Sequence, residues 1–209
     1  MRRRNTQGFS YQVKAIGERS FSGNSAIRSV TIENGVETIG RGAFSGCNRL
    51  ESVKLSDSLI QIGSDAFSGC GLQFIKIPDS VYYIEDRAFQ NCTQLSEVQF
   101  GVNSSLEEIR DYVFENCNLD KIILPEGLQK LGFGVFNNNP IRKLILPASL
   151  VSSGGTLLTN DEQKSVIILG DPQFSNLGSD MGFGDTAEIY GLSGSDAEQL
   201  AYSCGYSFF

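Results

Sequence analysis

The residues that most often perform chemistry in proteins are scarce in this chain. None of its 209 residues is a histidine, so a serine or cysteine nucleophile cannot be paired with an imidazole base. The adjacent acids Glu107-Glu108 and Asp161-Glu162 come nearest to an acid and base pair. Neighbouring strand residues point to opposite faces and loop residues are solvated, so neither pair predicts catalysis. We therefore expect no enzyme, no catalytic residue and no bound cofactor.

The five cysteines are the other candidates for chemistry. Four of them recur at one internal position of successive sequence units, where two further units carry asparagine: Cys47, Cys70, Cys92 and Cys117, with Asn24 and Asn139. An odd count and parallel side chains predict free, buried, structural thiols. Metal binding is the weaker alternative, because thiolate sites usually use close pairs such as C-x-x-C and the sequence has none. We expect no metal site.

These cysteines belong to a repeated unit, clearest at residues 50–70, LESVKLSDSLIQIGSDAFSGC. By subtraction, the first apolar residue of each unit recurs at steps of 23, 22, 23, 24 and 22 residues, at Ile27, Leu50, Leu72, Leu95, Leu119 and Ile141. This step lies in the range of about 20–29 residues typical of leucine-rich repeats. The sequence therefore predicts a solenoid, in which each coil is stabilised by its neighbours.

Each unit also predicts how its own coil folds. Apolar residues at plus three and plus five from the first, such as Val53 and Leu55, indicate a strand with one buried face. A second pair three residues apart, such as Leu59 and Ile62, predicts a short bent strand on the opposite side. A small residue and a phenylalanine follow, and we expect these rings to stack through the interior: Phe44, Phe67, Phe89, Phe114 and Phe136.

The pattern divides the chain into two predicted domains. Residues 1–186 form the repeat array, with clear units over 10–150 and degenerate last coils over 151–186, and residues 187–209 form a C-terminal cap. In the cap we expect a short strand over 187–190 and a helix opened by the capping box at 195–198. The fourth unit carries two extra residues, which predicts an outward loop at 101–105.

Composition narrows the class of partner. A formal net charge of −7 argues against nucleic acid or an anionic membrane surface. No apolar run approaches the roughly 20 residues of a membrane span, so we expect no membrane insertion. No apolar segment follows the basic start at 1–4, so an export signal is expected to lie outside this sequence. Protein remains the favoured partner class.

The pattern LxxVxIPxxVxxIGxxAFxxC, best matched by residues 72–92, resembles the BspA-like, or Treponema pallidum type, leucine-rich repeats. The closing stretch IYGLSGSDAEQLAYSCGYSFF is similar to the C-terminal cap of such arrays. The resemblance implies a right-handed, curved, β-rich horseshoe with short strands joined by helical or 3-10 turns. It also implies a bacterial protein that is secreted or attached to the cell surface and takes part in adhesion.

In this repeat type, the outward residues of each first strand are expected to line the concave surface. Here these positions hold three isoleucines in successive coils beside two lysines, with a phenylalanine in an earlier coil. An exposed apolar patch usually marks an interaction site. The candidate partner-binding residues are Phe74, Lys121, Ile123, Lys143, Ile145 and Ile167.

Two alternatives remain open for these isoleucines. They could simply satisfy strand propensity, or be covered by the irregular segment 170–185. At the level of the whole chain, we predict a noncatalytic module that binds protein on the concave sheet, with an architectural spacer as the alternative. The ligand and the oligomeric state are not fixed by the sequence.

Overall fold

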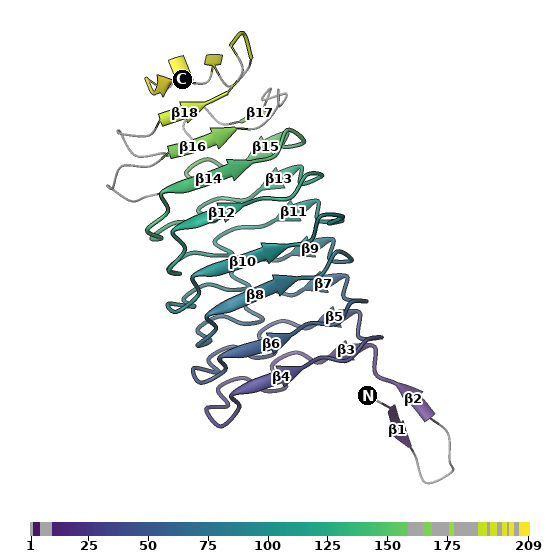
Figure 1. Ribbon diagram of the computed structural model, residues 1–209. Coiled ribbons are helices and arrows are strands. Elements are labelled where there is room, and N and C mark those ends of the chain that lie inside the picture. Colours follow the sequence, from purple (N-terminus) through teal and green to yellow (C-terminus); the bar gives the residue numbers. More distant parts are fainter. Residues whose placement is uncertain are drawn as a thin grey trace.

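The computed structural model describes residues 2–4, 10–158, 165–168, 176–177, 188–191, 193–195, 198–199, 201–202 and 205–209. The chain winds into a parallel β-solenoid of about seven turns, as the repeat predicts (Figure 1). Each coil contributes one longer and one shorter strand, and the two series lie on opposite sides of the core.

The short-strand face consists of two-residue strands that form one continuous parallel sheet of eight. These strands are β3 (Ala15–Ile16), β5 (Thr38–Ile39), β7 (Gln61–Ile62), β9 (Tyr83–Ile84), β11 (Glu108–Ile109), β13 (Lys130–Leu131), β15 (Ser152–Ser153) and β17 (Asn176–Leu177). Strand β17 pairs with β15, so the parallel sheet of this face extends beyond residue 151.

The long-strand face consists of strands of three or four residues. These are β4 (Ser29–Thr31), β6 (Ser52–Lys54), β8 (Phe74–Ile77), β10 (Glu97–Phe100), β12 (Lys121–Ile123), β14 (Lys143–Leu146), β16 (Ser165–Ile168) and β18 (Glu188–Tyr190). Two further elements were not predicted. An antiparallel pair, β1 (Arg2–Arg4) and β2 (Ser10–Gln12), lies at the N-terminal end, and β19 (Ser207–Phe208) extends the sheet beyond β18.

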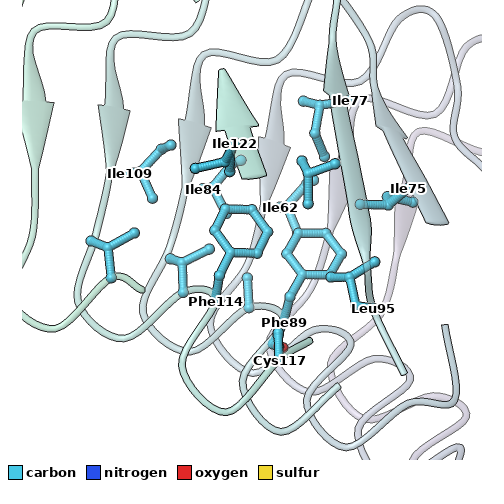
Figure 2. Close-up of a cluster of buried hydrophobic side chains, with 14 of the residues drawn as sticks. Ile62, Ile75, Ile77, Ile84, Phe89, Leu95, Ile109, Phe114, Cys117 and Ile122 are labelled. Carbon is cyan, nitrogen blue, oxygen red and sulfur yellow. The ribbon is translucent and has the colours of Figure 1, made fainter. Parts of the chain in front are cut away.

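The core runs along the solenoid between the two faces. Isoleucines and leucines from both strand series surround the phenylalanines, and all of them are buried (Figure 2). The predicted column of stacked rings is confirmed. The ring centroids of Phe44 and Phe67 lie 5.3 Å apart, as do those of Phe67 and Phe89, and the interplanar angles are 3° and 7°. Phe114 and Phe136 continue the stack. Offset stacking adds to the free energy gained from burying these rings.

The segments that carry these rings are hydrogen-bonded turns, so the prediction of helical or 3-10 turns is wrong for the clear coils. In the turn at residues 42–46, the Ser45 N–H donates to the Gly42 carbonyl at 3.1 Å. The Phe44 N–H instead donates to the Ala66 carbonyl of the next coil at 2.8 Å. Gly42 and Gly46 have φ values of 59° and 72°, which a 3-10 helix does not contain. Because bonds within a turn alternate with bonds between coils, the turns themselves stack as a ladder.

The internal cysteines complete these turns. Each thiol donates to the carbonyl of the phenylalanine one coil earlier, as Cys92 Sγ does to Phe67 O at 3.1 Å. Asn139 makes the same contact through Nδ2 to Phe114 O at 2.7 Å, which explains why asparagine can replace cysteine there. The cysteines described are free and buried, as predicted, and burial raises the pKa of the Cys92 thiol to about 12. Cys204 lies outside the described residues.

The C-terminal cap is described only in part. Strand β18 lies at its predicted place, and Tyr206 and Phe208 pack against the core. The Glu198 carboxylate accepts from the Gly194 N–H, whereas the buried Ser195 hydroxyl has no partner, so the hydroxyl half of the capping box is not formed. Several positions of the expected helix lie outside the described residues, and that helix stays a prediction.

Candidate functional site

The long-strand face places the predicted isoleucines in one row. Ile123 pairs with Ile145 in the ladder between β12 and β14, and Ile145 pairs with Ile167 in the ladder between β14 and β16. The Ile123 side chain is 49% exposed, and that of Ile145 is partly exposed. The side chain of Ile167 lies outside the described residues, so only its register is known.

Lys121 and Lys143 form the neighbouring row. They are register partners in the same ladder, and both are exposed. Phe74 is also exposed, at 42%, but its register partner is Glu97 of β10. The structure therefore brings four of the six candidates together on β12 and β14, Ile167 follows in register on β16, and Phe74 lies on a separate piece of sheet.

The separation arises because the long-strand sheet is interrupted. Within the described residues its strands form three separate sheets, β4 with β6, β8 with β10, and β12 with β14, β16, β18 and β19, and no ladder joins β6 to β8 or β10 to β12. A groove of about 1060 Å³ opens along the second interruption. Lys121, Ile123 and Ile145 line it from one side, and β10 lines it from the other.

The length of one short connection accounts for both interruptions. Two residues separate Cys47 from Leu50 and Cys92 from Leu95, whereas one residue separates Cys70 from Leu72 and Cys117 from Leu119. Each interruption lies where a two-residue connection is followed by a one-residue connection. Strands that follow connections of equal length, such as β12 and β14, remain paired, and so do β8 and β10, where a one-residue connection is followed by a two-residue connection.

The hydrogen bonds show how a shorter connection displaces the strand. At the regular junction before β14, the Arg142 N–H donates to Asp120 of the previous coil at 2.7 Å. Before β12, the bond is made earlier, from the Asn118 N–H to the Leu95 carbonyl at 2.9 Å. The chain is thus anchored at a different position, and β12 does not come into register with β10. Sequence reasoning missed this groove, although the connection lengths carry the signal.

The predicted loop at 101–105 flanks the groove. Val102 is 98% exposed and lines the groove mouth. The loop is bonded to the preceding coil, since the Ser105 N–H donates to the Asp79 carbonyl at 2.8 Å. A side chain at Gly101 would overlap the Asp79 carboxylate, because an added Cβ would lie 1.5 Å from Oδ1. The exposed Asp79 side chain would have to move to admit such a side chain.

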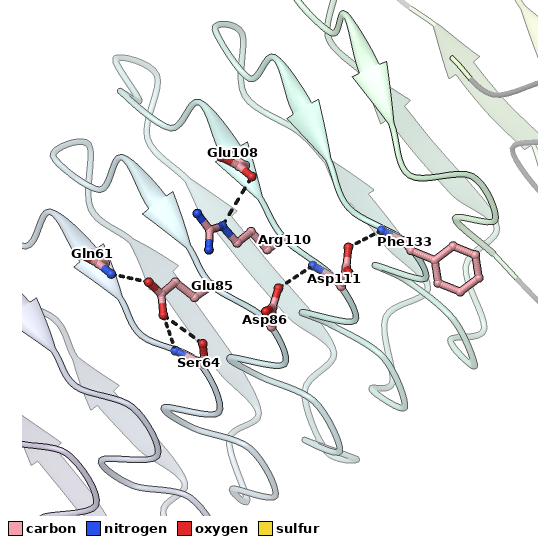
Figure 3. Close-up of polar contacts among 8 residues, drawn as sticks. All are labelled: Gln61, Ser64, Glu85, Asp86, Glu108, Arg110, Asp111 and Phe133. Atoms are coloured by element: carbon pink, nitrogen blue, oxygen red, sulfur yellow. Dashed lines mark hydrogen bonds and ion pairs between the residues drawn. The ribbon is translucent and has the colours of Figure 1, made fainter. Parts of the chain in front are cut away.

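The adjacent acids of the short-strand face have structural contacts. Glu108 pairs with Arg110 at 3.4 Å, as Figure 3 shows, and Glu107 hydrogen-bonds Tyr82, which raises the pKa of Tyr82 to about 12. Farther along the same turns, Asp111 accepts from the Phe133 N–H at 2.8 Å. These acids cap backbone groups and bind neighbouring side chains. Asp161-Glu162 lies outside the described residues.

Within the described residues, no group of three or more cysteines and acids is placed to hold a metal ion. The helical residues among them form no segment long and apolar enough to cross a membrane.

Comparison with known proteins adds to this geometry. The sequence model of the family described as "BspA type Leucine rich repeat region" matches this chain in six copies, over residues 14–142 and 99–186. A leucine-rich repeat protein from Bacteroides ovatus is 23% identical, with a TM-score of 0.51 over 90% of this chain and 61% of that one. The chain thus spans less than two thirds of that protein's structure. No curated protein gives a significant match.

Two further solved structures are similar over smaller or more divergent portions. A leucine-rich repeat protein from Bacteroides capillosus is 36% identical over 48% of this chain and 72% of that one, with a TM-score of 0.43. A leucine rich cell surface protein from Faecalibacterium prausnitzii is 17% identical over 86% of this chain and 67% of that one, with a TM-score of 0.47.

Proposed function

Because the chain belongs to the BspA type leucine rich repeat family, we propose that it is a noncatalytic protein-binding module of a secreted or surface-attached bacterial protein. The partner protein binds the long-strand face at the row formed by Ile123 and Ile145. The fold is a scaffold of stacked turns and strands, and fold alone does not define a partner.

One observation supports this proposal most strongly. Ile123 is 49% exposed on the edge strand of a hydrogen-bonded sheet, with a second isoleucine as its register partner. Solvent-facing positions of this kind usually carry polar side chains, as in the first coils, where Thr31 pairs with Lys54. Clustered apolar exposure beside charged residues is typical of a protein-interaction surface. Lys121 and Lys143 supply that charged border.

Adhesion of coated beads tests the proposal. Beads carrying the protein are applied to cultured epithelial cells and to bacterial cells, and bound beads are counted. The double variant Ile123→Asp/Ile145→Asp should reduce binding by more than about tenfold, because charged groups would replace the apolar contact. Since Ile145 is partly buried, Ile123→Thr/Ile145→Thr is measured as well, and it keeps β-branched side chains in the strands.

The matched control is Thr31→Asp/Lys54→Asp. These residues are register partners on the same face, in the first two coils, and both are exposed. Binding by the control variant should equal that of the unchanged protein, with all melting temperatures within a few degrees. If beads carrying the unchanged protein bind no more than albumin-coated beads, the chain acts as a spacer, and the proposal is wrong.

A further inference from the structure

Lys121 and Lys143 form a pair of like charges within one strand ladder. They are register partners on the neighbouring strands β12 and β14, so their backbones lie about 4.8 Å apart. Both side chains are exposed, whereas the next residue of each strand, Ile122 and Leu144, is buried. Like charges directly opposite each other destabilise a sheet. Folding alone therefore does not favour two lysines at these positions.

The carboxylates near this pair do not neutralise it. Glu97 lies on β10 of the preceding coil, Asp120 directly precedes Lys121, and Glu126 follows β12, and all three are exposed. Among the described residues, the ion pairs involve neither Lys121 nor Lys143. A carboxylate of a ligand would therefore reach either ammonium group without displacing an existing ion-pair partner.

The exposed isoleucines lie directly beside the lysine pair. Ile123 and Ile145 follow the lysines by two residues on the same strands, which places them on the same face about 6.6 Å farther along. One small area thus presents two cations and two aliphatic side chains, all on paired strands that fix their spacing. A ligand that matches both kinds of group must carry carboxylates beside apolar side chains.

We propose that the lysine pair and the two isoleucines beside it bind an acidic segment of the partner protein, in which carboxylate side chains lie next to apolar ones. The carboxylates form ion pairs with Lys121 and Lys143, and the apolar side chains cover the isoleucines. Binding also relieves the repulsion between the two ammonium groups, because a negative charge then lies beside them. This inference rests on the proposed function and specifies the partner's chemistry.

A protein segment matches this surface better than a nucleic acid or a sulfated glycan. Such polyanions bind mainly through their charges, which would leave Ile123 and Ile145 uncovered. The exposed acids Glu97, Asp120 and Glu126 would also repel the further charges of a long polyanion, and the chain as a whole carries a net charge of −7. A short acidic segment with apolar neighbours avoids both costs.

Fluorescence anisotropy with labelled peptides tests the inference. Three twelve-residue probes are compared: repeats of two glutamates and two leucines, of two glutamates and two glycines, and of two lysines and two leucines. The full chain should bind the glutamate-leucine probe at least about fivefold more tightly than either of the others, because only that probe matches both kinds of group. Labelled heparin serves as the polyanion without aliphatic side chains.

Charge variants locate the binding. Lys121→Glu/Lys143→Glu should weaken binding of the glutamate-leucine probe at least about tenfold, and Lys121→Gln/Lys143→Gln at least about threefold. The matched control is Arg49→Glu/Lys130→Glu, which should bind the probe as the unchanged chain does. Arg49 precedes β6 and Lys130 lies on the short-strand face, both are exposed, and neither belongs to the ion pairs described.

The glutamine variant also separates a binding role from a structural one. Because it removes the repulsion between the strands, its melting temperature should equal or exceed that of the unchanged chain while its affinity for the probe falls. A lower melting temperature with unchanged affinity would show that the lysines serve the fold, and would overturn the inference.

The remaining outcomes separate this inference from the proposed function. Bead adhesion that depends on Ile123 and Ile145, together with equal binding of the three probes, leaves the function standing and overturns the inference. Heparin bound more tightly than the glutamate-leucine probe, and lost in Lys121→Glu/Lys143→Glu, would assign the lysine pair to a polyanion. An oligomer seen by light scattering that the same variant dissociates would assign the surface to a second copy of the chain. Either result would contradict the inference.

Discussion

The two faces of the solenoid respond differently to variation in the repeat. The short-strand face has strands of only two residues, yet its eight strands pair without interruption. The long-strand face has longer strands but is interrupted twice. Longer strands would ordinarily be expected to pair better, so strand length does not set continuity. What differs is the connection that leads into each strand.

The short strand leads directly into the turn that carries the stacked phenylalanine. That turn is fixed by bonds to the next coil, such as Phe67 N–H to Ala88 O at 2.8 Å, and by the thiol bonds to the ring-bearing residue. The long strand instead follows the connection whose length changes between one and two residues. In this solenoid the strand pairing of the short-strand face is therefore constant, whereas the pairing of the long-strand face varies. The long-strand face carries the candidate site.

The largest expected effect comes from disrupting the phenylalanine column that the turns after the short strands carry. Phe67→Ala should lower the free energy of unfolding by about 3–5 kcal/mol, since it opens a cavity in a fully buried column. Phe74→Ala on the variable face is the matched change, and it should cost less than about 1 kcal/mol because that ring is 42% exposed. Urea denaturation followed by circular dichroism measures both. Equal losses would mean that the ring column is not what stabilises the coils.

A second test uses the titration of the buried thiols in the turns that carry the phenylalanines. Burial raises the pKa of Cys92 to about 12, whereas the thiol of the unfolded chain titrates near 9.0. As the pH rises, the unfolded state therefore loses this proton first. The stability due to Cys92 is fully present below pH 9.0 and is lost progressively as the pH rises from there toward about 12.

The variant Cys92→Asn isolates this contribution from other alkaline titrations. Asparagine already occupies the equivalent position at Asn139, bonds the same class of carbonyl, and does not titrate. The difference in unfolding free energy between Cys92→Asn and the unchanged chain should stay constant below pH 9.0 and then move in favour of the variant. A difference that stays constant into the alkaline range would show that the thiol is not desolvated.

The sequence was sufficient to predict the short-strand face and the phenylalanine column, because each of their positions has one physical requirement. An apolar residue, a small residue and phenylalanine recur with the step of the coil, and burial allows few alternatives. The alternation of Cys92 with Asn139 could also be interpreted, since both residues are small and can donate to a carbonyl. The rows of Ile123 and Lys121 followed from strand alternation alone.

The remaining features depended on pairings between coils that no single coil specifies. The helical or 3-10 turns were predicted only from the family resemblance, whereas in the structure residues such as Arg87 and Tyr112 adopt φ values of 58°. Arginine and tyrosine give no composition signal for that conformation, unlike glycine. The groove depends on a difference between successive connections, and therefore on two coils at once.

Changing a connection should move the interruption, with a small effect on stability. Deleting Thr93 leaves one residue between Cys92 and Leu95, as between Cys117 and Leu119. Strands β10 and β12 would then follow connections of equal length, as the paired strands β12 and β14 do. We expect a ladder to form and the groove to close. Amide hydrogen exchange at Lys121 and Ile123 should slow by at least about tenfold, while the free energy of unfolding changes by less than about 1 kcal/mol.

The reciprocal deletion makes this test specific. Removing Asn48 shortens the connection before Leu50, so the first interruption should pass from between β6 and β8 to between β4 and β6. Amides of β6 should then exchange faster, and those of β8 more slowly, without any change at β12. If neither deletion changes the exchange pattern, connection length is not the cause of the groove. If both act as expected, a single-residue difference between coils is sufficient to open a groove on an otherwise regular solenoid.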